Sequence, residues 1–280
     1  MPFETLTTGY GLIEGPRVDE RGNLYFSDVT NGGVYRRAPE GGIETVVPKR
    51  RGVGGIALHV AGGVVISGRD ICHVRDGETR ILFQGVEVPG FNDIFTDAEG
   101  RVYAGSLRSN PFAGPGEETE RRPGELYRID GENDAVELYG EVLLSNGIGL
   151  APDGRTIWHS DTARNAVLAH RLAADGRIER SDPVIRVDAG GPDGLAVDED
   201  GCVWVAIYGG GCVQRFTPDG TLDRTLPVPA TAVTSLCFGG SDRRDLYVVS
   251  ADNSEDPARA GSIFRTRSDV AGLPVALARI

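Results

Sequence analysis

Cationic residues are scarce in this chain of 280 residues. Its 29 lysines and arginines stand against 41 aspartates and glutamates, which gives a net charge of −12. Nucleic acids and anionic membrane surfaces are bound through clustered Lys and Arg, so this balance argues against both as partners. No apolar run approaches the roughly 18 residues of a membrane-spanning helix. The first residues also lack the basic and apolar regions of a signal peptide, so we expect a cytoplasmic protein.

Cysteine and histidine are also rare, with four of each. No two cysteines have the C-x-x-C spacing of zinc or redox sites, and their apolar contexts predict buried free thiols. The histidines lack the H-E-x-x-H spacing of zinc proteases, and no G-x-S-x-G motif of serine hydrolases occurs. A G-x-G-x-x-A pattern at residues 52–57 precedes a strand, whereas dinucleotide binding requires a helix there. Packing or surface roles are therefore expected for the four histidines, and no dinucleotide site is expected at residues 52–57.

Glycine and proline are abundant, with 40 and 16 residues spread along the chain. This distribution is typical of many tight turns between short strands. In four segments a polar anchor is followed eight positions later by a glycine, and an alternating strand comes next. These segments are residues 14–22, 92–100, 146–154 and 193–201. Two weaker copies begin at Gly55 and Ser235.

The spacing of these units predicts the architecture. Unit starts at 14, 55, 92, 146, 193 and 235 are separated by 41, 37, 54, 47 and 42 residues. Four short strands per unit at this spacing are typical of propeller blades. No long amphipathic helix interrupts the pattern, and a β-sandwich would not need six related units. We therefore predict an all-β, six-bladed β-propeller with four-stranded blades, formed as one domain by residues 1–280.

Equivalent positions of the innermost strands converge on the channel of a propeller, so the anchors should meet at one mouth. Four of them are polar: Glu14, Asn92, Asn146 and Asp193. Each could be a turn residue, but the shared register favours a common role. Two carboxylates brought together without a partner repel each other and lose hydration. A hard divalent cation with oxygen ligands resolves this cost, and the sequence therefore predicts a central metal site.

Several motifs resemble one known family, that of SMP-30, gluconolactonase and the luciferin-regenerating enzyme. The resemblance covers essentially the whole chain. It is carried by Ile13-Glu14-Gly15-Pro16, Ser145-Asn146-Gly147, Pro192-Asp193-Gly194-Leu195, the strand Val203-Trp204-Val205-Ala206, and Thr234-Ser235-Leu236-Cys237-Phe238-Gly239-Gly240.

The resemblance implies a six-bladed propeller whose single divalent metal is bound at Glu14, Asn146 and Asp193. Ca²⁺ is expected first, with Zn²⁺, Mn²⁺, Mg²⁺ and Fe²⁺ as alternatives. Members of the family hydrolyse sugar lactones, and some relatives act on organophosphates. By the same resemblance, Asp193 is the general base, Asn92 contacts the substrate or a metal-bound water, and Glu120 contacts the substrate.

Four points remain open in the sequence. Many sugar-lactonase members carry an arginine where this chain has Gly90, so an uncompensated loss predicts a substrate less polar than an aldonolactone. The long segment 106–125 reads as a loop, either a lid or a solvated insertion. A small lactone is the expected substrate. A phosphotriesterase or other esterase on the same metal, and a non-catalytic metal-binding interaction propeller, are the alternatives. The sequence predicts no oligomeric state.

Overall fold

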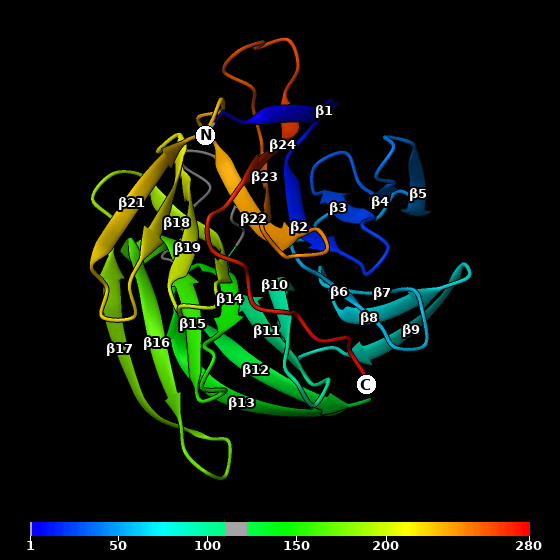
Figure 1. The fold of residues 1–280 in the computed structure, drawn as a ribbon. Coiled ribbons are helices and arrows are strands. Elements are labelled where there is room, and N and C mark those ends of the chain that lie inside the picture. The colour runs from blue at the N-terminus through cyan, green and yellow to red at the C-terminus, as the bar shows by residue number, and fades with distance from the viewer. Residues whose placement is uncertain (1, 110–121) are drawn as a thin grey trace.

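The computed structural model describes residues 2–109 and 122–280. Figure 1 shows their strands grouped into six sheets around one centre. Each sheet has four antiparallel strands, so the fold is the six-bladed β-propeller that the repeat predicted. The only helix among the described residues is one short 3₁₀ turn, η1 (Thr162–Arg164). No helix in those two ranges is long and apolar enough to cross a bilayer.

Five blades are continuous in sequence, and each begins with its innermost strand. The first blade contains β2 (Ile13–Val18), β3 (Leu24–Asp28), β4 (Val34–Arg37) and β5 (Ile43–Val47), and the second β6 (Ile56–Leu58), β7 (Val64–Ile66), β8 (Ile71–Arg75) and β9 (Glu78–Phe83). The third contains β10 (Gly90–Thr96), β11 (Val102–Leu107), β12 (Gly124–Gly131) and β13 (Asp134–Val142), and the fourth β14 (Ser145–Leu150), β15 (Thr156–Asp161), β16 (Ala166–Leu172) and β17 (Ile178–Arg186). The fifth contains β18 (Gly191–Val197), β19 (Val203–Tyr208), β20 (Cys212–Phe216) and β21 (Leu222–Pro227).

The sixth blade joins the two ends of the chain. It contains β22 (Val233–Gly239), β23 (Asp245–Ser250) and β24 (Gly261–Arg267), and its outermost strand is β1 (Glu4–Tyr10). Strand β1 pairs antiparallel with β24, with Glu4 opposite Arg265. The repeated frame begins at Glu14 and does not include this strand. Its pairing closes the ring without a covalent link.

The repeated acidic-glycine frame forms the turn between the first two strands of a blade. In the first blade the Asp19 carboxylate accepts hydrogen bonds from the backbone N–H groups of Arg21 and Asn23, at 2.9 and 2.8 Å. Asp97 and Asp198 do the same in the third and fifth blades. The frame glycines of these turns adopt positive φ angles of 80°, 84° and 80°, which glycine takes without steric cost (Gly22, Gly100 and Gly201). The turns therefore use residues other than the anchors.

Apolar side chains fill the spaces between neighbouring blades. Trp204, Leu236 and Phe264, for example, belong to one buried cluster shared by the fifth and sixth blades. All four cysteines are buried and unpaired, as predicted (Cys72, Cys202, Cys212 and Cys237). Burial raises the pKa of the Cys72 and Cys237 thiols to about 12, so both are protonated at neutral pH.

The last residues of the chain cross one end of the ring, where Figure 1 shows them in red. The N–H of Leu273 donates to the Val197 carbonyl of the fifth blade at 2.9 Å, and that of Ala278 donates to Leu58 of the second at 2.8 Å. Both acceptors lie at the ends of inner strands. The opposite end of the ring, where the inner strands begin, is therefore the end free of this segment.

The predicted loop over residues 106–125 was too long at both edges. Strand β11 continues to Leu107 and β12 begins at Gly124. The Glu125 carboxylate pairs with Arg108 at 2.7 Å and accepts the Ser106 hydroxyl at 2.5 Å, which ties the two strands together. Glu120 and the stretch interpreted as a lid fall outside the described residues.

Candidate functional site

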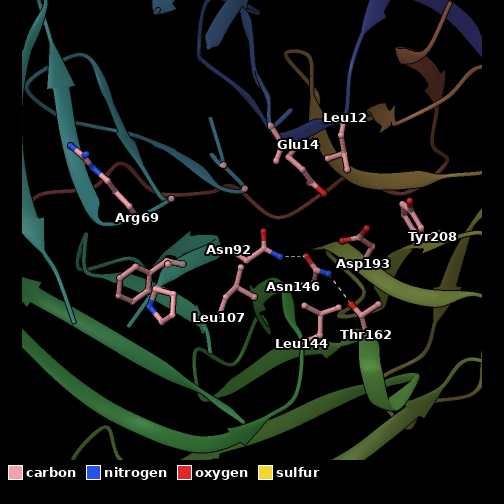
Figure 2. A pocket seen from close by; sticks show the side chains of 17 residues that line it. Leu12, Glu14, Arg69, Asn92, Leu107, Leu144, Asn146, Thr162, Asp193 and Tyr208 are labelled. Atoms are coloured by element: carbon pink, nitrogen blue, oxygen red, sulfur yellow. Dashed lines mark hydrogen bonds between the residues drawn. The ribbon is translucent and has the colours of Figure 1, made fainter. Parts of the chain in front are cut away.

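The four polar anchors line one pocket at the start of the inner strands. Glu14, Asn92, Asn146 and Asp193 come from β2, β10, β14 and β18, and they surround a cavity of about 360 Å³. Figure 2 shows their side chains turned toward one another. The two weaker anchors behave differently. The second blade contributes Gly54 to the lining, and Ser235 lies outside it, against the α-carbon of Gly194.

Irregular pairing of the inner strands exposes the anchors to the axis. In the first blade the register between β2 and β3 shifts between Glu14 and Arg17. The same shift surrounds the anchors of the third, fourth and fifth blades. A bulge of this kind leaves residues out of the ladder and redirects their side chains. Asn92, Asn146 and Asp193 lie within the irregularity of their strand, whereas Glu14 is the last paired residue before it.

A chain of hydrogen bonds fixes which way the Asn146 amide points. The Pro192 carbonyl can only accept, so the Thr162 hydroxyl donates to it at 2.7 Å. That hydroxyl then accepts the amide N–H of Asn146 at 2.8 Å. The Oδ1 atom of Asn146 consequently faces the other way, toward Asn92, whose Nδ2 lies 2.5 Å from it (Figure 2).

Asn92 is held equally firmly. Its Nδ2 donates to Asn146 Oδ1 and, at 2.8 Å, to the backbone carbonyl of Ser145, so both amide hydrogens are used. Its Oδ1 lies where a Cβ on Gly54 would stand, 2.0 Å from that position. The absence of a side chain at Gly54 therefore makes room for the Asn92 amide. Asn92 can offer the pocket only an acceptor.

Glu14 and Asp193 are two buried carboxyl groups in the same pocket, 8% and 6% exposed. Burial, followed by the charges of Asp193 and Asp93, raises the pKa of Glu14 well above its ordinary value. Burial and then the charge of Asp93 raise the pKa of Asp193 in the same direction. The Oδ1 atom of Asp193 is buried and has no hydrogen-bond partner among the described residues. Buried carboxylate oxygens are costly without a partner, so this site fits a cation.

The donor set agrees with a hard cation. Glu14 and Asp193 supply carboxylate oxygens, and the oriented Oδ1 of Asn146 supplies a carboxamide oxygen. Oxygen ligands of this kind suit Ca²⁺, Mg²⁺ or Mn²⁺ better than a soft metal. In the part of the chain that the structure describes, no three His, Cys, Asp or Glu side chains cluster as metal ligands. A cation here would therefore depend on the carboxamide as well as on the two carboxylates.

A buried ion pair accompanies the site, and the sequence did not reveal it. Asp93, next to Asn92, faces Arg17 at 3.6 Å, and both side chains are about nine-tenths buried. Arg17 also donates to the Ile94 carbonyl at 2.9 Å, which joins the first blade to the third. Asp93 accepts the N–H of Ile148 at 3.3 Å and so reaches the fourth blade. The two charges connect three blades close to the anchors.

Two buried aspartates at the ends of second strands, Asp28 and Asp161, have structural roles. The Asp28 carboxylate accepts the N–H of Gly11 at 2.9 Å, and that of Asp161 accepts those of Leu143 and Leu144 at 3.1 and 3.2 Å. No histidine is among the described residues that line the pocket. Thr162, Tyr208 and Arg69 do line it, although sequence reasoning missed them. Thr162 and Arg69 follow the second strands of their blades and Tyr208 ends one, outside the repeated frame, so no periodic signal marks them.

Comparison with known proteins agrees with the fold. Residues 12–252 match the family described as SMP-30/Gluconolactonase/LRE-like region. The chain is 31% identical to a 6-deoxy-6-sulfogluconolactonase of Pseudomonas putida, over 89% of this chain and 88% of that protein. It is also 31% identical to the pentonolactonase XacC of Haloferax volcanii, over 95% and 90%. The solved structure of a luciferin-regenerating enzyme superposes with a TM-score of 0.88 at 22% identity, covering 100% of this chain and 99% of that one.

Proposed function

Because this chain belongs to the SMP-30/gluconolactonase/LRE-like family, we propose that it hydrolyses a small lactone at the pocket of the four anchors. The observation that carries the proposal is the pair of buried carboxyl groups, Glu14 and Asp193, facing two fixed carboxamides in one cavity. A purely structural propeller does not need such a pair, whose burial without a partner opposes folding. The lactonase names of two relatives supply the reaction class.

Glu14, Asn146 and Asp193 would hold one divalent cation, with Ca²⁺ expected first. Such an ion supplies a Lewis acid for the lactone carbonyl and acidifies bound water. The residues themselves fit this role, because Asp193 has a buried unpartnered oxygen and Asn146 is oriented by Thr162. The family resemblance confirmed above implies the same three ligands. Glu120, outside the described residues, remains a proposed contact to substrate.

Asp193 is the proposed general base. It takes a proton from the attacking water while the water oxygen forms a bond to the carbonyl carbon. The ring C–O bond then breaks, and the ring oxygen leaves as a hydroxyl group by taking the proton back, which yields a hydroxy acid. Asn92 can accept a hydrogen from this water or from a substrate hydroxyl through its Oδ1, since both hydrogens of its amide are already used. This bonding disfavours Asn92 as a donor to the developing oxyanion.

The proposal is tested by measuring acid release in a pH-stat with lactones ranging from γ-butyrolactone to gluconolactone. The protein is first treated with a chelator and then loaded with Ca²⁺, Mn²⁺ or Zn²⁺. We expect turnover that depends on the added ion and disappears in Glu14→Ala. Turnover of phosphotriesters or simple esters with no lactone activity would assign the pocket to another hydrolase. No turnover of any of these compounds by the metal-loaded protein would favour a binding propeller.

Gly54→Ala is expected to lower kcat/KM about 10- to 100-fold, because the new Cβ would displace the Asn92 amide from its hydrogen bonds. The melting temperature should fall little, since the displaced group is the end of one side chain. Gly42→Ala is the control, because a Cβ there meets no atom within 4 Å. Unchanged kcat/KM in Gly54→Ala would show that the position of Asn92 does not matter for the reaction.

Asp193→Asn is expected to raise the melting temperature of chelator-treated protein at neutral pH. The raised pKa of Asp193 means that folding favours the protonated carboxyl. This stabilisation is complete below the ordinary carboxyl pKa of about 4 and is lost as pH rises through the raised pKa. The difference in melting temperature between variant and wild type should therefore grow between pH 5 and pH 8. Asp188→Asn, an exposed acid, should show no such growth. A variant that melts below the wild type at pH 8 contradicts the prediction.

A further inference from the structure

Charge is unevenly distributed around the pocket. Among its described lining residues, Arg69 is the only cationic side chain, whereas Glu14 and Asp193 are the carboxylates. Figure 2 shows Arg69 well apart from those two, with Asn92 between them in the view. A cation that merely compensated the carboxylates would lie against them. Arg17 already lies close enough to lower the pKa of Glu14. Arg69 is therefore not needed to balance the charges of Glu14 and Asp193.

The main chain of Arg69 is fixed in the wall. Next to it, Gly68 forms an isolated bridge with Phe91, and the Phe91 N–H donates to the Gly68 carbonyl at 2.6 Å. This bridge fastens the second blade to the third, one residue from Asn92. The backbone next to Arg69 is therefore hydrogen-bonded to the third blade.

Only part of the Arg69 guanidinium is hydrogen-bonded to described residues. Its Nε bonds the Asp70 carboxylate at 3.1 Å, and Arg50 bonds the same carboxylate at 2.5 Å. Two guanidinium groups thus share one buried carboxylate, which leaves a net positive charge beside the pocket. The two terminal nitrogens of Arg69 make no hydrogen bond to a described residue, and the side chain is 79% exposed. Such a free pair of N–H donors is suited to a planar or tetrahedral oxyanion.

Two residues before Asn92, Gly90 lines the pocket without a side chain, next to the backbone of Gly68. A long, exposed arginine changes rotamer within nanoseconds, so it can turn along this surface toward a bound ligand. The cavity of about 360 Å³ lies in the range of small-molecule sites. A ligand could therefore contact both the carboxylate side and the Arg69 side.

We propose that Arg69 binds an anionic substituent of the substrate, carried away from the reacting carbonyl, so that the enzyme prefers lactones bearing a carboxylate, sulfonate or phosphate group. This rests on the proposed lactone hydrolysis. The reacting carbonyl lies at Glu14 and Asp193, and the anionic group lies across Asn92 from them. Arg69 is then a residue that determines specificity through KM, whereas Asp193 acts on kcat.

The test compares kcat/KM for γ-butyrolactone with that for the same ring bearing a carboxylate on the γ-carbon. In the wild type, the charged lactone should be the better substrate. Arg69→Ala should reduce the ratio of charged to neutral kcat/KM by about 10- to 100-fold, mainly through KM, and Arg69→Lys should retain part of it. Arg51→Ala removes an exposed arginine outside the pocket lining and should keep the wild-type ratio.

The outcomes separate the two proposals. A wild type that hydrolyses both lactones, with a ratio that Arg69→Ala does not change, overturns the role of Arg69 and leaves lactone hydrolysis standing. A wild type that hydrolyses no lactone, from γ-butyrolactone to gluconolactone, overturns both. Exposed substitutions seldom cost more than about 0.5 kcal/mol of stability. Because Arg69 is exposed, the melting temperatures of Arg69→Ala and Arg69→Lys should lie within about 2 °C of the wild type.

Discussion

Asp193→Asn lowers kcat for lactone hydrolysis by about 10²- to 10⁴-fold, which is the usual contribution of a general base. The substitution keeps the size of the side chain and an oxygen that can face a cation, so the loss isolates the proton transfer. The measurement is kcat in a pH-stat at saturating lactone, with the divalent ion raised until activity no longer increases. A retained ability to bind the ion, measured by calorimetry, shows that the loss is chemical.

The pH profile gives a second readout of the same role. Without the Asp193 carboxylate, the residual rate should rise in proportion to hydroxide concentration, because solvent base replaces the side chain. Asp188→Asn makes the same acid-to-amide change on the exposed surface of this region and should keep the wild-type profile. Full kcat in Asp193→Asn with the ion bound would assign the base to another group. The same variant should melt at a higher temperature in chelator, so stability and activity should change in opposite directions.

Most of this site could be predicted from sequence because its parts share one repeated frame. The anchors stand eight residues before a turn glycine, and in a propeller such equivalent positions converge. Glu14, Asn92, Asn146 and Asp193 accordingly line one pocket. The turns were equally predictable, because an aspartate that accepts two backbone N–H groups and a glycine of positive φ recur in order. A local pattern that repeats carries information about distant contacts.

The other features of the fold and of the site depend on contacts that the repeated frame does not encode. Thr162, which orients Asn146, follows a second strand of its blade and occurs in a short 3₁₀ turn. Strand β1 completes the sixth blade through pairing with β24, at a separation of some 260 residues. The edges of the third-blade insertion were misplaced because Ser106 and Glu125 are small or polar residues that nevertheless belong to paired strands. Each of these is a tertiary contact that overrides local composition.

Arg17→Met is expected to destabilise the protein by about 3–5 kcal/mol, since it leaves the buried Asp93 carboxylate without its cation. It also removes the donor that bonds the Ile94 carbonyl of the third blade. A loss of this size lowers the melting temperature by on the order of 10 °C in a chain of this length. The measurement is thermal and urea unfolding of both proteins in the presence of chelator, so that ion binding does not contribute.

The double variant Arg17→Met with Asp93→Asn provides the control, because it removes the unpaired charge and keeps an acceptor for the Ile94 N–H. It should be more stable than Arg17→Met alone. Burial raises the pKa of Asp93 even with Arg17 present, and loss of Arg17 raises it further. Stability of the single variant is therefore retained at low pH and lost as pH rises through that pKa, so its deficit should widen from pH 5 to pH 8. Exposed ion pairs contribute at most about 1 kcal/mol. If Arg17→Met lowers the free energy of unfolding by less than this at pH 8, the Arg17–Asp93 pair does not hold the three blades together.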